Sequence, residues 1–373
     1  TGDVTCEAGV LLKDILELLI PQGWFLPVLP GTQYVTLGGA IANDIHGKNH
    51  SVFGSFGCHV KQFELCRSDG QRLKCSPSEN ADLFAATIGG LGLTGVLTWA
   101  TIQARPIPSP DLTCETLKFQ HVREYFQLED ESKQSHEYRV AWVDCLSTEG
   151  HLGRGLFSRA NHLQPPAGKS YRAKTKPQLT LPFTPPFSLV GKASLKAMNA
   201  AYFHLHRQEH VKRSMAYQDF FFPLDQILHW NRAYGPKGFY QHQCVVPKEN
   251  GEDAITALLE VIAREGVGSF LIVLKSFGDI TSPGFLSFPR EGYTLALDFP
   301  NRGQATLDFL ETLDDIVRDA KGAIYPAKDA RMSSLMFETS FPRLQEFEAF
   351  VDPGFSSSFW RRVRRSKTEK VMS

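Results

Sequence analysis

A polar, glycine-rich segment near the N-terminus constrains this chain more than any other part of its sequence. Residues 36–57 read TLGGAIANDIHGKNHSVFGSFG, which is too polar for a hydrophobic core. Gly38 and Gly39 allow the main chain to approach a bound group closely, and residues 40–42 suit the first turn of a helix. The first turn of a helix has unpaired N–H groups, so we expect a phosphate or a similar anion to bind here.

The same segment places acid, base and cation close together. Asp44, His46, Lys48 and His50 form a mixture that is typical of reactive centres. A single histidine is more often structural, but the neighbouring Asp44, Lys48 and glycines favour a functional role for His46. His46 and His50 also have the spacing of two zinc ligands on one helix, but Gly47 weakens such a helix and no clear third ligand follows. We therefore predict a reactive, anion-binding site without a metal.

Composition indicates a globular protein with more than one domain. The 373 residues are enough for two domains of ordinary size. The 40 basic and 40 acidic side chains cancel, which argues against nucleic-acid binding. Seven scattered cysteines without a CxxC pair indicate neither a disulfide framework nor a structural zinc site.

We expect a chain that does not span a membrane. No apolar run approaches the roughly 18 residues of a membrane span, and the opening residues TGDVTCEAGV lack the basic and apolar regions of a signal peptide. The basic residues 361–367 could touch an anionic membrane, although charges near a terminus are usually a solvated helix face. These features predict a location in the cytoplasm or at the membrane surface, with at most peripheral membrane contact.

Apolar periodicity divides the N-terminal part of the chain into short α/β elements. The predicted strands are 4–9, 25–31 and 96–104, the predicted helices are 11–23 and 82–88, and residues 60–74 are a predicted hairpin. The run RPIPSP at residues 105–110 interrupts this pattern, so we place a domain boundary there.

The middle of the chain has longer elements of both kinds. The predicted strands are 139–145, 239–247, 269–277 and 293–299, and the predicted helices are 252–265 and 304–320. Such blocks favour an antiparallel sheet with helices on one face. Residues 161–192 and 223–237 fit no element, and loops of that length are usually lids or disordered.

The hexapeptide GLGLTG at residues 90–95 matches the glycine fingerprint of dinucleotide-binding Rossmann folds. That fingerprint requires a strand before it and a helix after it, whereas here a helix is predicted before it and a strand after it. The hexapeptide therefore predicts a glycine turn that lies against a ligand or against neighbouring backbone.

Several long segments of this chain match the pattern of a known protein family. They are LPGTQYVTLGGAIANDIHGKNH, GSFG, DLFAATIGGLGLTG, WNRAYGPKGF, LSFP, DFP and YPAKDAR. The first of them resembles the segment that lies along FAD in flavoproteins of the vanillyl-alcohol oxidase and p-cresol methylhydroxylase type. Together they resemble, more closely, the family of the decaprenylphosphoryl-β-D-ribose oxidases, and the similarity runs over nearly the whole chain.

The resemblance implies a two-domain α+β flavoprotein of the vanillyl-alcohol-oxidase-like fold. Residues 1–110 and 324–373 would form a discontinuous FAD-binding domain, and residues 111–323 a substrate domain built on an antiparallel sheet with helices on one face. FAD would be held without a covalent bond. The residues that the resemblance places against FAD are Gly31, Thr36, Leu37, Gly38, Gly39, Asn43, Asp44, Ile45, His46, Leu97 and Tyr325.

The resemblance also implies a substrate and a reaction. The chain would oxidise the 2′-hydroxyl of a polyprenylphosphoryl-β-D-ribose to a keto sugar, which a separate keto-reductase partner would reduce with inverted configuration. Hydride transfer to a flavin needs a base for the hydroxyl proton and positive charge nearby. Lysines would supply the charge, and either Lys328 or His46 would be the base. The implied substrate-binding residues are Lys48, Trp230, Gln241, Gln243, Lys275 and Lys328.

Two other functions stay open at this point. One is an aldonolactone or alditol oxidase of the same fold, similar to arabinono-1,4-lactone oxidase, which passes electrons to oxygen. The other is a flavin-free binding or scaffold module that keeps the fold.

The chain differs from the family pattern in three places. The family's glycine-rich pyrophosphate loop lies before Thr1, so we expect a protein that began there to lack one wall of the FAD site. Thr294 and Ala296 stand where the mycobacterial members have asparagine and cysteine, and Phe221 stands where a tyrosine is usual. We therefore expect the sugar and lipid to differ from those of the family more readily than the chemistry.

Overall fold

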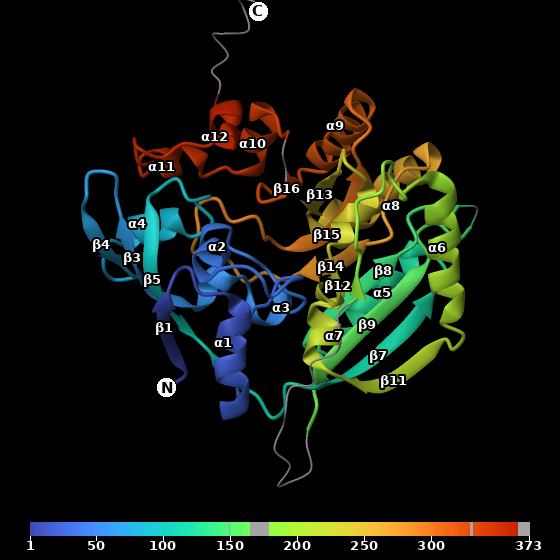
Figure 1. Cartoon of the computed structure of the whole chain (residues 1–373), viewed down its shortest axis with the longest axis horizontal. Coiled ribbons are helices and arrows are strands. Elements are labelled where there is room, and N and C mark those ends of the chain that lie inside the picture. Colours follow the sequence, from blue (N-terminus) through green and yellow to red (C-terminus); the bar gives the residue numbers. More distant parts are fainter. Residues whose placement is uncertain (149, 165–178, 329–330, 365–373) are drawn as a thin grey trace, which may run out of the picture.

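Two antiparallel sheets dominate the structure, with short helices between them (Figure 1). The computed structural model describes residues 1–148, 150–164, 179–328 and 331–364. Within these ranges the smaller sheet has four strands in the order β1-β5-β3-β4, and the larger has eight in the order β11-β7-β9-β8-β14-β15-β13-β16. In Figure 1 the smaller sheet lies on the left, in blue and cyan, and the larger on the right.

The N-terminal elements build the smaller sheet and its helices. Strands β1, β3, β4 and β5 and helix α1 lie where the sequence predicts them. In α1, Leu12, Ile15, Leu16 and Leu19 are buried, because their spacing puts them on one helical face. The bounds are β1 (Asp3–Glu7), α1 (Leu12–Leu19), β2 (Trp24–Phe25), α2 (Leu37–Ala42), α3 (His50–Phe53), β3 (Val60–Cys66), β4 (Arg72–Cys75), α4 (Ala81–Thr87), β5 (Val96–Gln103) and β6 (Arg105–Pro106).

The predicted strand at residues 25–31 is wrong beyond its first residue. Only β2 forms, and it pairs with β6. Pro27 and Pro30 have no N–H to donate to a neighbouring strand, so the chain leaves the sheet after Phe25. The carbonyl oxygen of Pro27 instead accepts a hydrogen bond from Asn49 Nδ2 at 2.9 Å.

The larger sheet is antiparallel throughout, and helices cover one of its faces. Helices α8 and α9 pack on β13, α5 packs on β7, β8 and β9, and α8 contacts both other helices. The predicted α+β class, with an antiparallel sheet and helices on one face, is confirmed. The bounds are β7 (Leu112–Phe119), α5 (Val122–Ser132), β8 (Tyr138–Val143), β9 (Gly155–His162), β11 (His210–Met215), β13 (Phe239–Val246), α8 (Lys248–Glu265), β14 (Val273–Phe277), β15 (Gly292–Pro300), α9 (Gln304–Asp319) and β16 (Ala323–Ile324).

The two segments left unassigned by sequence contain regular structure in their described parts. Residues 223–237 form two short 3-10 helices around β12 (Ile227–Leu228), which pairs with β10 (Leu179–Thr180). The segment 161–192 ends at the start of α6 (Lys192–Leu205), and its residues 165–178 lie outside the described residues. Helix α7 (Tyr217–Phe221) follows β11.

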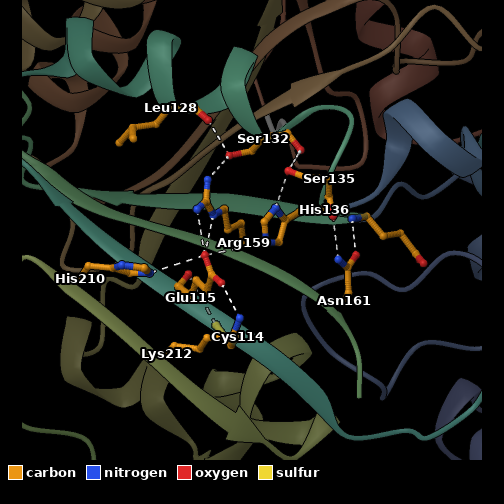
Figure 2. A network of polar contacts seen from close by, with 11 residues as sticks. Cys114, Glu115, Leu128, Ser132, Ser135, His136, Arg159, Asn161, His210 and Lys212 are labelled. Carbon is orange, nitrogen blue, oxygen red and sulfur yellow. Dashed lines mark hydrogen bonds and ion pairs between the residues drawn. The ribbon is translucent and has the colours of Figure 1, made fainter. Parts of the chain in front are cut away.

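Opposite charges on neighbouring strands hold the outer edge of the larger sheet (Figure 2). Glu115 on β7 lies opposite Arg159 on β9 and Lys212 on β11 in the strand register. Arg159 donates to Glu115 Oε2 from Nη2 at 2.8 Å, and Lys212 Nζ lies 2.9 Å from Oε1. The hydrogen bonds from Lys212 and Arg159 lower the pKa of Glu115 to about 2. Cross-strand pairs of opposite charge contribute roughly 0.2–1 kcal/mol each, so the network helps to fix this register.

The chain returns to the smaller sheet at its C-terminal end. Helices α10 (Ser334–Ser340), α11 (Leu344–Glu348) and α12 (Ser358–Val363) lie above that sheet in Figure 1, in red. Asp352 bonds to the β3–β4 turn, where it accepts from Ser68 N at 2.9 Å and pairs with Arg67 Nε at 3.1 Å. These contacts support the proposal that residues 1–110 and 324–373 form one domain around residues 111–323.

The basic C-terminal stretch is only partly described. Arg362 Nε donates to Met332 O at 3.0 Å, and Arg364 Nη1 pairs with Glu338 at 3.5 Å. Residues 365–367, which belong to the predicted membrane-contacting stretch, lie outside the described residues. In the part of the chain that the structure describes, no helix combines the length and apolar character needed to cross a bilayer.

Candidate active site

The segment 36–57 bridges the two sheets. Helix α2 packs on β5 of the smaller sheet, and α3 packs on β14 of the larger one. In Figure 1 both helices lie between the sheets. The residues singled out by sequence therefore lie where the smaller sheet faces the larger one.

The N-terminus of α2 differs from its prediction. The helix begins at Leu37, before the predicted first turn, with Thr36 as its N-cap. Thr36 Oγ1 accepts from Gly39 N at 3.1 Å, while Leu37 N and Gly38 N donate to carbonyls of the β1–α1 connection, Val10 O and Ala8 O, each at 2.8 Å. The expectation that these N–H groups are unpaired is wrong, because the protein itself uses them, and anion binding at this segment stays a prediction.

A glycine-walled cavity of about 320 Å³ lies beside α2. A Cβ atom on Gly9 or Gly92 would meet no atom within 4 Å, so both glycines leave this space open. Gly95, with a φ of +141°, approaches Cys66 O so closely that a Cβ would lie 2.7 Å from it. The predicted glycine turn at residues 90–95 thus lies against backbone and lines the cavity as well. The lining residues are Ala8, Gly9, Thr36, Gly38, Gly39, Ala42, Thr87, Gly92, Gly95 and Leu97.

Four residues predicted to bind FAD line this cavity, namely Thr36, Gly38, Gly39 and Leu97. The other residues predicted to bind FAD do not line the cavity. Leu37 and Ile45 are buried in a hydrophobic core cluster, which leaves only their backbone for a cofactor. Gly31 is exposed and is not among the lining residues.

Both carboxylate oxygens of Asp44 accept hydrogen bonds from other residues of the protein. Its Oδ1 accepts from Gly57 N at 2.7 Å, and its Oδ2 accepts from Ser282 Oγ at 2.6 Å and Ser287 Oγ at 2.5 Å. Burial raises the pKa of this carboxyl. Asp44 therefore ties the loop after β14 to the segment 36–57, and its side chain is not presented to the cavity.

His46 is buried in a box of aromatic rings. Its ring centroid lies 4.8 Å from Phe277, 5.7 Å from Phe288 and 5.2 Å from Tyr325. Tyr325 is held by its hydroxyl, which donates to Asn43 O at 3.0 Å. His50 does not share a helix with His46, because α3 begins at His50, so the spacing of two ligands on one helix is not realised.

Gln243 sets the hydrogen bonding of His46. Gln243 Nε2 lies 2.9 Å from His46 Nε2, and it donates also to Thr294 Oγ1 at 3.1 Å. Since an amide nitrogen can only donate, His46 Nε2 accepts and the neutral ring carries its proton on Nδ1. His46 Nδ1 is buried and has no hydrogen-bond partner among the described residues. Burial, and then the positive charge of Lys275, hold the pKa of His46 well below its usual value.

The strand register places five polar side chains and Ala296 on one face of the larger sheet. Gln241 lies opposite Asp298, Gln243 opposite Ala296, and Lys275 opposite Thr294. Alternate residues of a strand share a face, so these six side chains project to the same side. The residues between them pack in the core on the other side, among them Cys244, Leu274, Leu295 and Leu297.

Lys275 lies on this polar face, and Lys48 and Lys328 are near enough for their charges to act on it. Lys275 Nζ donates to Gly47 O at 3.4 Å, and burial and the charges of Lys48 and Lys328 lower its pKa to about 7. Lys48 Nζ donates to Phe220 O and lies 4.4 Å from the centre of the Phe220 ring, and burial lowers its pKa to about 7. Lys328 is exposed to solvent, yet the surrounding protein lowers its pKa while Asp298 raises it.

One member of this face was missed by sequence reasoning. Asp298 is almost fully buried and accepts from Gln241 Nε2 at 2.8 Å. Burial raises its pKa to about 7. The signal was present in the sequence TLALDF, where Thr294 and Asp298 share one face of β15 and large apolar residues occupy the other.

Trp230 is placed apart from these groups. Its ring packs against Phe239 at 5.4 Å and Tyr234 at 6.2 Å, at the start of β13 and in the preceding 3-10 helix. The structure gives Trp230 no contact with the lysines or with His46, so its role in substrate binding rests on the resemblance alone.

Known proteins match both the N-terminal part of the chain and nearly its whole length. The FAD binding domain family matches residues 1–76. A decaprenylphosphoryl-β-D-ribose oxidase from Mycolicibacterium smegmatis is 37% identical over 385 aligned residues, which cover 97% of this chain and 80% of that protein. The chain belongs to the family of the decaprenylphosphoryl-β-D-ribose oxidases. Like them, it is an FAD-dependent oxidoreductase with the vanillyl-alcohol-oxidase type of fold.

Two further relatives mark the breadth of the similarity. An uncharacterized protein of Streptomyces coelicolor is 33% identical over 95% of this chain and 100% of its own length. The L-gulonolactone oxidase of Mus musculus is 38% identical, but the match covers only 28% of this chain and 23% of that enzyme. Full-length similarity therefore favours the decaprenylphosphoryl-β-D-ribose oxidases over the lactone oxidases.

The residues around the cavity beside α2 and around His46 are compatible with bound FAD. The cavity beside α2 is walled by glycines whose missing side chains leave room for a flat or extended group. The buried Nδ1 of His46 needs an acceptor that no described residue supplies. Both features are expected of a site that a cofactor or its substrate completes.

The buried charge of Lys275 predicts a pH dependence of stability. Its pKa falls from 10.5 in the unfolded chain to about 7 in the folded protein, so between these values the unfolded state binds one more proton. This lysine therefore makes the free energy of unfolding rise as the pH rises from 7 toward 10. In Lys275→Met that contribution is absent. In urea unfolding of the apoprotein, we expect Lys275→Met to have a higher free energy of unfolding than wild type at pH 7. This difference in free energy should become smaller toward pH 10. A difference that did not change with pH would contradict the lowered pKa of Lys275.

Proposed function

We propose that the protein oxidises the 2′-hydroxyl of a polyprenylphosphoryl pentose to a keto sugar. The observation that carries this proposal is the contact of His46 with Gln243 on the polar sheet face, where Lys275 also lies and where Lys48 and Lys328 are near enough to act on its charge. Cations with lowered pKa values bind a phosphate and hold or release protons near neutral pH. The mycobacterial relative is named for decaprenylphosphoryl-β-D-ribose, which has both a phosphate and secondary hydroxyls.

Each residue has a role in this proposal. Bound FAD supplies the hydride acceptor. Lys275 and Lys48, whose ammonium groups are fixed by Gly47 O and Phe220 O, provide positive charge for the sugar phosphate. Gln241 and Gln243 orient the sugar hydroxyls by hydrogen bonds.

Lys328 is the better candidate for the base. To accept a proton from a hydroxyl, a group must be accessible and unprotonated at working pH. Lys328 is exposed and has a lowered pKa. His46 is less suited, because its Nε2 is engaged by Gln243 and its Nδ1 already carries the proton. We assign His46 the role of a hydrogen-bond donor to negative charge that develops on the cofactor or substrate.

A keto-sugar product implies a second enzyme. A separate reductase would return the ketone to a hydroxyl of inverted configuration, because the oxidation by itself only removes the stereocentre. We therefore propose a keto-reductase as the partner in the reaction sequence.

Product analysis tests this function. The holoprotein is incubated with a polyprenylphosphoryl-β-D-ribose and an artificial electron acceptor, and the lipid product is examined by mass spectrometry. We expect a product lighter by two hydrogen atoms, with the carbonyl at the 2′ position. Rapid peroxide formation from a free aldonolactone, with the polyprenyl sugar left unchanged, would instead identify a lactone oxidase.

A further inference from the structure

Thr294 has a hydrogen bond that links it to the site through Gln243. The residues His46, Gln243 and Thr294 expose 7%, 5% and 1% of their surface, so water competes little for their hydrogen bonds. The two N–H groups of the Gln243 amide are divided between His46 Nε2 at 2.9 Å and Thr294 Oγ1 at 3.1 Å. In this orientation the amide uses both of its N–H groups, and both of its partners are buried.

The orientation of the amide decides which nitrogen of His46 carries the proton. With the amide nitrogen toward the ring, Nε2 must accept and Nδ1 is protonated. If the amide turned over, its oxygen would face Nε2, and the proton would have to move to Nε2. His46 would then present a lone pair at Nδ1, where the proposed function requires a donor.

We infer that Thr294 is a positioning residue, which holds the Gln243 amide so that His46 keeps its proton on Nδ1. The inference about the tautomer stands on the hydrogen bonds alone. Its consequence for catalysis rests on the proposed function. Thr294 does not need to touch the substrate or the cofactor for this role.

The strand register supports a role for the hydroxyl beyond packing. Thr294 lies directly opposite Lys275 on β14 and on the same face as Gln243, which pairs with Ala296 two residues along β15 from Thr294. A valine would fill the same space and keep the same β-branched shape. Only the hydroxyl can accept the second N–H of Gln243, and a buried N–H without an acceptor drives the amide to another orientation.

Nuclear magnetic resonance of the histidine rings tests the tautomer without any turnover. The protein is labelled with nitrogen-15 histidine, and the signals of His46 among the 12 histidines are identified from their loss in His46→Phe. We expect the Nδ1–H tautomer in the wild type, a mixture or the Nε2–H tautomer in Thr294→Val, and the Nδ1–H tautomer again in Thr294→Ser. An unchanged spectrum in Thr294→Val would overturn the inference.

A matched variant controls for the general effect of removing a buried hydroxyl. Thr101 on β5 is also buried, and its Oγ1 bonds to Thr5 Oγ1 at 2.8 Å in the smaller sheet. Thr101→Val should leave the His46 signals in place. A change there as large as in Thr294→Val would mean that loss of any buried hydroxyl perturbs the site, and the specific role of Thr294 would be lost.

Anaerobic reduction of the bound flavin tests the catalytic consequence. Removing one donor to developing charge slows enzymes ~10²–10³-fold, and a partial shift of tautomer should cost about tenfold. We expect that loss in the reduction rate of Thr294→Val, with unchanged FAD binding and recovery in Thr294→Ser. If wild type is not reduced by the polyprenyl sugar, the proposed function fails and the ring spectra decide the inference. If wild type and Thr294→Val are reduced equally fast, the catalytic role is wrong.

Discussion

Replacing Lys328 with alanine is expected to stop the reduction of bound FAD by the sugar substrate while FAD stays bound. Lys328 is the exposed member of the three lysines, and the surrounding protein lowers its pKa, which makes the amine easier to deprotonate. Loss of a general base slows enzymes roughly 10²–10⁴-fold, and we expect a loss in that range. Stopped-flow absorbance under anaerobic conditions measures the rate.

Lys328→Arg separates proton transfer from charge. Arginine keeps the positive charge but cannot release its proton near neutral pH. If Lys328 is the base, the arginine variant should be as slow as the alanine variant. A reduction rate close to wild type in Lys328→Arg would show that only the charge matters and would contradict the assignment. Lys74→Ala, an exposed lysine of β4, serves as a matched control and should react like wild type.

His46→Phe is expected to have the second large effect. Phenylalanine keeps a ring in the box formed by Phe277, Phe288 and Tyr325, but it removes the Nδ1 donor. The rate of flavin reduction should fall about 10²–10³-fold, which is the usual cost of one donor to developing charge. The loss should appear in kcat with little change in KM, because the donor acts in the transition state.

His242→Phe separates catalysis from stability on the same strand. His242 lies between Gln241 and Gln243 on β13 but points to the other face, where its Nε2 lies 3.0 Å from Asp314. Its replacement should lower the free energy of unfolding and leave flavin reduction near the wild-type rate. If His46→Phe only lowered stability in the same way, without slowing reduction, His46 would have no role in the chemistry.

The position of the site could be predicted from the sequence because its signals are local. Glycines, charged side chains and histidines are crowded into residues 36–57, and no core or ordinary surface requires that mixture. The strands β13 and β15 and the helices α8 and α9 were also predicted, because each has a clear apolar period over enough residues. The antiparallel sheet and its covered face follow from these elements.

The sequence did not predict three strands of the larger sheet, because their charged residues make contacts between strands. Strands β7, β9 and β11 carry Glu115, Arg159 and Lys212, whose charges interrupt the apolar alternation but pair with each other across the sheet (Figure 2). The N-terminus of α2 was misjudged for a similar reason. Its N–H groups are satisfied by Ala8 and Val10, and such partners cannot be read from the helix sequence itself.

The rest of the site depends on strand register. Gln241, Gln243 and Lys275 were named only through the resemblance, and Asp298 was not named at all. Their meeting requires that β13, β14 and β15 pair as they do, because a shift by one residue would move every side chain to the other face. The link from Thr294 through Gln243 to His46 likewise exists only in the folded chain.

The decisive experiment is an anaerobic titration of the FAD-loaded protein with a polyprenylphosphoryl-β-D-ribose. If the segment 36–57 holds FAD beside a polar sheet face that binds and oxidises this sugar, the sugar must reduce the flavin. We expect the visible absorbance of the oxidised flavin to disappear as the sugar is added, with one equivalent of keto sugar formed for each flavin reduced. A flavin that stays oxidised with the polyprenyl sugar, but is bleached by an aldonolactone, would contradict it.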